Sequence, residues 1–205
     1  MSKRLILIGA SGHGKVVADI AKKIGYTEIY FLDDNDAVKE CGGYKVIGKS
    51  DNVSDYTDCD FLVSIGNSSI RENIQKALED KGLPVVSLIH PNAVIGENVE
   101  IGIGTVVMAG AVVNSGTRIG KGCIINTSSS VDHDCIIEDF VHVSVGTHVA
   151  GTVKIGKSTL IGAGATVVNN VDIIDNCMIG AGAVVVGNIK KAGTYIGVPA
   201  RRMDT

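Results

Sequence analysis

Hydrophobic residues recur with a period of six over the C-terminal two thirds of the chain. From Ile89 to Val185 every sixth residue is Ile or Val, without a break in register, and the residue four positions later is nearly always small or β-branched. This hexapeptide repeat is typical of a parallel β-helix, in which three hexads close one triangular coil. The seventeen hexads of residues 89–190 therefore predict a β-helix of between five and six coils, with no long inserted loop.

The first third of the chain has a different pattern, in which apolar runs alternate with amphipathic segments. The apolar runs predict strands at 4–8, 28–32, 61–65 and 84–88. Helical spacing of the apolar residues predicts a first helix that buries Val16, Val17, Ile20 and Ala21. A second helix is expected over 69–81, with Ser68 or Ser69 as its N-cap.

Strands that alternate with helices in this way are typical of a small parallel α/β unit. The period-six pattern begins where the alternation stops. We therefore expect an α/β domain at 1–88, a β-helix domain at 89–190 and a short C-terminal tail at 191–205.

A glycine-rich turn joins the first strand to the first helix. Gly9–Gly14 has the spacing G-x-x-G-x-G, and the second strand ends at Asp33 and Asp34. Glycines let the backbone approach a phosphate, and an acid after the second strand can accept hydrogen bonds from a ribose or a base. The spacing is not that of the dinucleotide motif, and the unit is small, so it favours a mononucleotide such as UDP on a sugar over NAD. The alternative is a tight turn that binds nothing.

Composition excludes several classes of function. Hydrophobic residues make up 45% of the chain and charged residues 20%, which excludes wholesale disorder. A formal charge of −3 provides no overall basic field for nucleic acid or an anionic membrane. No apolar run approaches the roughly 18 residues that span a bilayer, and the apolar run at 5–8 is too short for a secretory signal. We expect a cytoplasmic protein without nucleic-acid or membrane partners.

The five cysteines form no C-x-x-C motif and no regular framework, which fits reduced thiols. Cys123, Cys135 and Cys177 all fall at the small inward position of the repeat. We therefore interpret them as core thiols and not as nucleophiles.

Outward polar residues of the β-helix are the candidates for chemistry. His133 is the third residue of its hexad, so it faces outward, and Asp134 follows it directly. A carboxylate beside a histidine stabilises the imidazolium ion, which makes the pair a candidate general base. The alternative is a solvated histidine at a corner.

His142 and His148 are outward residues of two consecutive hexads. Each fits a surface or subunit-interface position. Together with His133 they could instead bind zinc across a subunit interface, as in trimeric β-helix carbonic anhydrases. A separate basic cluster, Lys190-Lys191 with Arg201-Arg202, fits either a polyphosphate ligand or a solvated tail.

Seven motifs, spread in order over nearly the whole chain, carry a family resemblance. They are Gly9–Gly14, Phe31-Leu32-Asp33-Asp34, Ile65-Gly66-Asn67, Leu88-Ile89-His90-Pro91, Asn126–Cys135, His142-Val143-Ser144-Val145-Gly146 and Gly197-Val198-Pro199-Ala200. With them the chain resembles the left-handed β-helix sugar acetyltransferases that carry an N-terminal nucleotide-sugar domain. The nearest members are the UDP-4-amino-sugar N-acetyltransferases of bacillosamine and perosamine synthesis, and sialic acid O-acetyltransferase-like proteins are close relatives.

The resemblance implies a Rossmann-like α/β subdomain followed by a left-handed parallel β-helix, assembled as a homotrimer with its ligands between neighbouring β-helices. It implies that His133 is the general base and that Asp134, where the family often has Glu, raises its basicity. The residues implied to hold the nucleotide-sugar are Ser11, Gly12, His13, Asp33, Asp34 and Gly66. Those implied to line the acetyl-CoA groove are His142, Gly151, Ala163 and Ala181, of which the last two stand where relatives carry Ile or Gly.

The implied reaction is direct transfer of an acetyl group from acetyl-CoA to a sugar amine, without a metal. A backbone amide near Gly151, or His142, would stabilise the oxyanion. Three alternatives stay open: O-acetylation of a sialic-acid-like sugar, a zinc-dependent carbonic-anhydrase-like hydratase, and a binding trimer without enzymatic activity.

Overall fold

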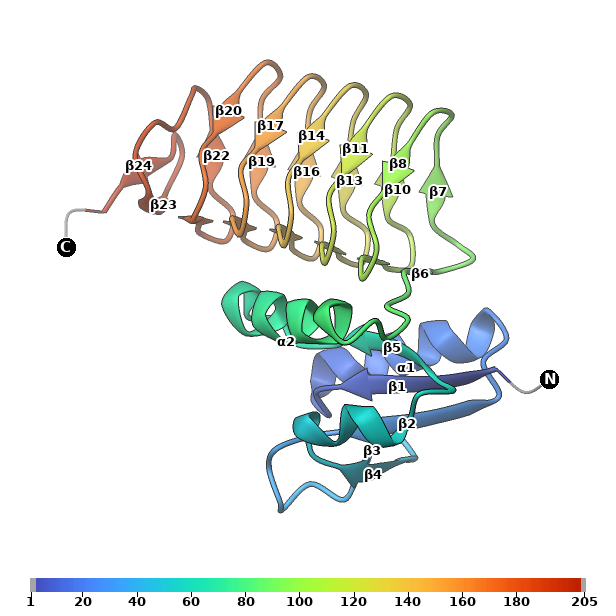
Figure 1. Cartoon of the computed structure of the whole chain (residues 1–205). Helices are drawn as coiled ribbons and strands as arrows, with labels where there is room; N and C mark the ends of the chain where they lie inside the picture. The colour runs from blue at the N-terminus through green and yellow to red at the C-terminus, as the bar shows by residue number, and fades with distance from the viewer. Residues whose placement is uncertain (1–2, 204–205) are drawn as a thin grey trace. The chain divides into compact units, whose positions relative to one another are not determined.

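The computed structural model describes residues 3–203, and the chain divides after Pro91 into two compact units. The first unit is built on a five-stranded sheet and the second is a β-helix (Figure 1). Within the described residues, no helix is long and apolar enough to cross a membrane.

The first unit contains a mostly parallel sheet of strand order β3-β4-β2-β1-β5. Only β3 runs antiparallel to its neighbour β4. In chain order its elements are β1 (Arg4–Ile8), α1 (Gly12–Lys23), β2 (Glu28–Leu32), β3 (Glu40–Cys41), β4 (Tyr44–Gly48), the 3-10 helix η1 (Ser50–Asp55), β5 (Asp60–Val63) and α2 (Ser68–Asp80). The predicted α/β fold is confirmed.

Burial explains why β1 is a near-continuous apolar run. It lies between β2 and β5, and Leu5 to Ile8, whose side chains alternate between the two faces of the sheet, are at most 1% exposed, so both faces are covered along this strand. Helix α1 covers the sheet with Val17, Ala18, Ile20 and Ala21. Val16, which we expected on that face, is 42% exposed. It lies about 100° around the helix from Val17, outside the buried arc.

Three details of the first unit differ from the sequence prediction. In place of the expected strand at 84–88 there is a single bridge between Phe61 and Val85, and Leu88 belongs to the next strand, β6 (Leu88–Ile89). The N-cap of α2 is Asn67, whose Oδ1 accepts a hydrogen bond from the Ile70 N–H at 3.0 Å, and not Ser68 or Ser69. The β3–β4 hairpin and η1 were not predicted, because they are short and carry no clear hydrophobic period.

Each of the seventeen hexads contains one short strand, from β6 (Leu88–Ile89) to β22. In the second unit, strands β7 to β22 form three parallel sheets, one per side of the coil (Figure 1). The β9 face has β9 (Val106–Val107), β12 (Ile124–Ile125), β15 (His142–Val143), β18 (Leu160–Ile161) and β21 (Cys177–Ile179), continued by β23 (Gly193–Ile196) and β24 (Arg201–Arg202). The β13 face has β7 (Val94–Ile95), β10 (Val112–Val113), β13 (Ser130–Val131), β16 (His148–Val149), β19 (Thr166–Val167) and β22 (Val184–Val185). The β14 face has β8 (Glu100–Ile101), β11 (Arg118–Ile119), β14 (Ile136–Ile137), β17 (Lys154–Ile155) and β20 (Asp172–Ile173).

The repeat residues fill the interior of the coils as predicted. Every Ile or Val of the repeat from Val107 to Val185 is at most 3% exposed. Cys123, Cys135 and Cys177 are buried free thiols at the small inward position. Burial raises the thiol pKa of Cys135 and Cys177, which keeps them protonated and unreactive.

The corners of the coils share one backbone conformation. Every sixth residue from Asn98 to Gly182 has a positive φ of the left-handed type. Strand pairing places residues eighteen apart directly above one another, as with Ser130 and His148. The side chains at each corner therefore form a column with an eighteen-residue step.

Two neighbouring isoleucines test this inward–outward assignment. Ile137 is 1% exposed, whereas Ile136 of the same strand is 45% exposed. Ile137→Ala should lower the free energy of unfolding by roughly 2–5 kcal/mol because it leaves a cavity between the coils. Ile136→Ala should change it by less than about 0.5 kcal/mol. Denaturant unfolding of both variants checks the assignment, and equal losses would contradict it.

Candidate active site

His133 and Asp134 form a contacting pair at the corner between β13 and β14. The imidazole Nδ1 lies 2.9 Å from Asp134 Oδ2. Because an ionised carboxylate only accepts hydrogen bonds, the Nδ1–H must be the donor. This leaves the Nε2 lone pair free to accept a proton. Asp134 has φ 56°, a conformation that Asp and Asn tolerate better than other non-glycine residues.

Electrostatics favour the protonated form of His133. The hydrogen bond that His133 donates to Asp134 raises the pKa of His133 above its ordinary value, and the charge of Asp132 adds to the effect. Asp132 Oδ1 accepts hydrogen bonds from the His133 N–H at 2.8 Å and from Asn114 Nδ2 at 2.7 Å. The bond from Asn114 lowers the pKa of Asp132, which keeps this carboxylate ionised. The imidazole is thus held by one carboxylate and its backbone by another.

Gly151 lies eighteen residues after His133 and therefore directly beside it in the corner column. A Cβ atom at Gly151 would lie only 2.5 Å from His133 Nε2, so no larger residue fits under the ring without displacing it. The Gly151 N–H donates no hydrogen bond within residues 3–203. The imidazole Nε2 therefore lies next to Gly151, whose backbone N–H is unused.

An open groove of about 510 Å³ runs along the same corner from His133. Its lining follows the eighteen-residue step, and consists of Gly96, Glu97, Asn114, Ser115, Asp132 and His133. Sequence reasoning missed Asn114, Asp132 and Glu97. Stepping back by eighteen from Asp132 would have identified Asn114.

The structure does not bring the other expected acetyl-CoA residues to this corner of the same chain. His142 lies on β15 of the β9 face, where its Nε2 contacts Asn126 Nδ2 at 3.2 Å. Ala163 and Ala181 stack at the corner between the β9 and β13 faces. His148 lies on the β13 face with its Nδ1 2.9 Å from Ser130 Oγ. No three metal-binding side chains gather within residues 3–203.

The expected nucleotide-sugar residues lie at the carboxyl edge of the sheet in the first unit. Ser11 is the N-cap of α1, and Gly12 and His13 begin the helix. Gly66 follows the neighbouring strand β5. Strand order reverses between β1 and β5, because β2 pairs with the other side of β1. Ligands of open α/β sheets bind at such a switch point.

The two expected acids hold backbone and side-chain groups of their own unit. Asp33 Oδ2 accepts a hydrogen bond from the Ala10 N–H at 2.7 Å and so shapes the glycine-rich turn. The Asp34 carboxylate accepts hydrogen bonds from Ser50 Oγ and from the Ser50 N–H. A carboxylate has about four acceptor positions, so both acids keep some capacity for a ligand.

The glycines of the turn fall into two kinds. A Cβ at Gly14 would lie 2.4 Å from the Gly9 carbonyl oxygen, and one at Gly9 would lie 2.5 Å from Ile65 Cγ1. Those two glycines are required by packing. Added Cβ atoms at Gly12 and Gly66 meet nothing within 4 Å, so backbone is accessible at both.

His13 sits in an unusual environment for a titratable residue. Its Nε2 is buried with no hydrogen-bond partner among the described residues. Burial, together with the positive charge of Arg71, lowers the pKa of His13 to about 4. The imidazole is therefore uncharged at neutral pH.

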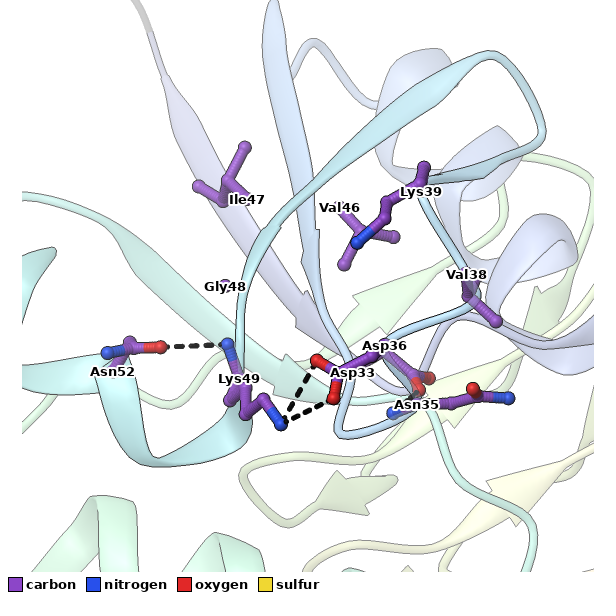
Figure 2. Close-up of a pocket in the computed structure, with 10 residues that line it drawn as sticks. All are labelled: Asp33, Asn35, Asp36, Val38, Lys39, Val46, Ile47, Gly48, Lys49 and Asn52. Carbon is purple, nitrogen blue, oxygen red and sulfur yellow. Dashed lines mark hydrogen bonds and ion pairs between the residues drawn. The ribbon is translucent and has the colours of Figure 1, made fainter.

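A polar pocket of about 320 Å³ lies farther along the same unit, between the loop after β2 and the end of β4 (Figure 2). Asp33 and Asp36 contribute carboxylates, and Lys39 and Lys49 contribute cations. Lys49 Nζ pairs with the Asp36 carboxylate at 3.1 Å, and the Lys49 N–H donates to Asn52 Oδ1 at 2.8 Å.

Comparisons with known proteins match both units. The family model described as "PglD N-terminal domain" matches residues 4–78. The UDP-N-acetylbacillosamine N-acetyltransferase of Bacillus subtilis (strain 168) is 34% identical over 112 residues, which cover 52% of this chain and 52% of that enzyme. The match thus spans about half the length of this curated relative.

Two solved structures match along nearly the whole chain. The acetyltransferase domain of PglB from Neisseria gonorrhoeae FA1090, in complex with acetyl coenzyme A, has a TM-score of 0.95 and 39% identity, and the match covers 99% of this chain and 100% of that one. PerB from Caulobacter crescentus, in complex with CoA and GDP-perosamine, has a TM-score of 0.94 and 32% identity, with 98% and 97% covered. These matches confirm the predicted fold, with a left-handed β-helix.

The His133–Asp134 contact makes a prediction that needs no substrate. Asp134→Asn keeps a side chain that tolerates the left-handed corner but removes the carboxylate. Because that carboxylate raises the His133 pKa, the variant should lower it. NMR titration of the imidazole measures the change, and Asp172→Asn, an exposed carboxylate of the same unit, serves as the control. An unchanged His133 pKa in Asp134→Asn would show that the pair does not form in solution.

Proposed function

Because this chain belongs to the family of left-handed β-helix N-acetyltransferases that carry a PglD N-terminal domain, we propose that it acetylates the amine of a nucleotide-linked amino sugar with acetyl-CoA. The observation that carries the proposal is the free His133 Nε2 lone pair next to Gly151, a residue whose backbone N–H is unused. A base and a backbone donor at one point are what acyl transfer to an amine requires.

In the proposed reaction the sugar amine attacks the thioester carbonyl of acetyl-CoA. A C–N bond forms and the C–S bond breaks, and the CoA sulfur takes the proton held by His133, so that CoA leaves as the thiol. His133 Nε2 takes the proton that the amine loses, and Asp134 stabilises the resulting imidazolium. The Gly151 N–H donates to the oxygen of the tetrahedral intermediate. The chemistry needs no metal because the thioester is already activated.

The lining of the groove supports an amine acceptor over a hydroxyl acceptor. Glu97 and Asp132 place two carboxylates in the groove that His133 lines, and the groove-lining residues include no Lys or Arg. A negative field attracts a sugar ammonium ion and has no comparable attraction for a neutral hydroxyl. This argues against the O-acetyltransferase alternative.

The nucleotide-sugar is proposed to bind the first unit through Ser11, Gly12, His13 and Gly66. The accessible backbone at Gly12 and Gly66 and the start of α1 suit the diphosphate. Asp33 and Asp34 are proposed to contribute as well, Asp33 chiefly by holding the turn through Ala10. We retain a UDP-4-amino-sugar as the expected acceptor class.

Acetyl-CoA is proposed to bind between neighbouring copies of the chain. His142, Ala163 and Ala181 lie on a different edge of the coil from His133 and Gly151. A homotrimer would bring the first set from one copy to the second set of its neighbour. The basic residues around β23 and β24, where Arg202 Nε donates to the Ala192 carbonyl, are suited to the phosphates of CoA. Dependence on acetyl-CoA fits the expected cytoplasmic location.

The first test is release of free thiol from acetyl-CoA by the purified chain. We expect release with a UDP-4-amino-sugar and none with the unlinked amino sugar or with sialic acid. GDP-linked amino sugars belong in the same panel, because PerB was solved with GDP-perosamine. Release with sialic acid alone would support O-acetylation, and protein that neither binds acetyl-CoA nor releases thiol would overturn the proposal.

Removal of the base is the second test. His133→Ala should lower kcat by roughly 10²–10⁴-fold, the usual contribution of general-base catalysis. In the unsubstituted protein kcat/KM should fall as the pH drops through a value above about 6.5, since Asp134 raises the pKa of the group that must be unprotonated. Near-normal turnover in His133→Ala would exclude His133 as the base. The outward His148→Ala is the matched control.

A further inference from the structure

Arg71 is a buried arginine in the first unit. Two features of its position, the helix dipole and burial, disfavour a positive charge there. It lies in the first turn of α2, where the helix dipole disfavours a cation. Its exposure is 1%, and burial of a charge is costly unless that charge is well satisfied. Residues that break local rules in this way concentrate at functional sites.

The contacts of Arg71 lead to the switch point between β1 and β5. Its Nη1 donates hydrogen bonds to the carbonyl oxygens of Ile65 and Gly66, each at 2.8 Å. These carbonyls form the start of the loop that joins β5 to α2. The loop begins beside the glycine-rich turn, because Ser64 Oγ donates to the Gly9 carbonyl at 2.8 Å.

We propose that Arg71 is a positioning residue for the nucleotide-sugar. It holds the carbonyls of Ile65 and Gly66, and through them the loop beside the Gly9–Gly14 turn. The backbone at Gly12 and Gly66 is then in place to receive the diphosphate. Arg71 itself contributes no surface to the ligand. This inference rests on the proposed function. It adds a buried residue that holds the binding loop in place without touching the ligand.

Charge supports the same role. Arg71 and the N-terminus of α1 both favour an anion at this edge of the sheet. The charge of Arg71 also contributes to the low pKa of His13, after burial, so His13 faces the ligand as a neutral imidazole. A neutral His13 can accept or donate a hydrogen bond without adding a titrating charge to the site.

The test compares Arg71→Met, which removes the charge and both hydrogen bonds, with Arg71→Lys, which keeps the charge and one compact donor. Arg71→Met should raise the KM for the nucleotide-sugar about tenfold or more, with the KM for acetyl-CoA changed less than about twofold. Arg71→Lys should recover part of the loss. Arg4→Met is the matched control. It also removes an arginine with side-chain partners, Glu28 and Asp58, but at the start of β1 and not at the binding loop, so it should leave both KM values unchanged.

Calorimetric titration with UDP and with the nucleotide-sugar separates the possible failures. If the unsubstituted chain binds the nucleotide and both Arg71 variants bind it equally well, the inference is overturned while the proposed function stands. If the unsubstituted chain neither binds nucleotide nor releases thiol, both fall.

A purely structural arginine would lower thermal stability without altering the KM for the nucleotide-sugar or the titration of His13. That outcome would also overturn the inference. NMR titration of His13 should show a pKa raised toward its ordinary value in Arg71→Met, which removes the charge. In Arg71→Lys, which retains the charge and is the variant expected to stay folded, the His13 pKa should stay close to that of the unsubstituted chain. If Arg71→Met does not fold, the KM of Arg71→Lys decides: a value equal to that of the unsubstituted chain contradicts the role.

Discussion

Hydrogen bonding between successive coils is the constraint on which the β-helix and its site depend. The N–H of each strand donates to a carbonyl seventeen residues later, as His142 does to Thr159 and Ser130 does to Thr147. Such pairing satisfies the backbone only if every coil has the same length. The uninterrupted hexads provide that length, so residues eighteen apart are held one above the other. The neighbours of a side chain at a corner are therefore the residues eighteen positions before and after it.

The eighteen-residue step brings together the groups around the proposed base, His133. His133 meets Gly151 one coil later, and Asp132 meets Asn114 one coil earlier. The corner also puts Asp134 into the left-handed conformation, from which its carboxylate reaches the imidazole Nδ1. No mobile loop is needed to bring these groups together. A rigid solenoid can thus hold a base and a backbone donor in the mutual geometry that acyl transfer needs.

The sequence predicted those parts of the structure that follow from a regular period or from adjacency in the chain. The hexads predicted the strands from β6 to β22 but not β23 and β24, which lie beyond residue 190. Adjacency predicted the contact between His133 and Asp134. The β3–β4 hairpin carries no period, and the N-cap at Asn67 precedes the expected Ser68 and Ser69 by one and two residues. Arg71 escaped notice because a buried arginine in an amphipathic helix has the same sequence signature as an exposed one. Its role depends on tertiary contacts with Ile65 and Gly66, which no local pattern encodes.

A glycine-rich motif is ambiguous as a sign of ligand binding until its glycines are separated by what surrounds them. In Gly9–Gly14, the first and last glycines are required by the fold, because a side chain at either would collide with β5-loop or turn atoms. A turn that binds nothing would still need both. Gly12 has no such requirement, and neither has Gly66 on the adjacent loop. Packing therefore accounts for the spacing of the outer glycines, while ligand access is the better physical reason for the inner one. The case for a nucleotide-sugar at this edge therefore rests on the accessible backbone of Gly12 and Gly66 and on the hydrogen bonds from Arg71 that hold the loop of Gly66. It does not rest on the motif as a whole.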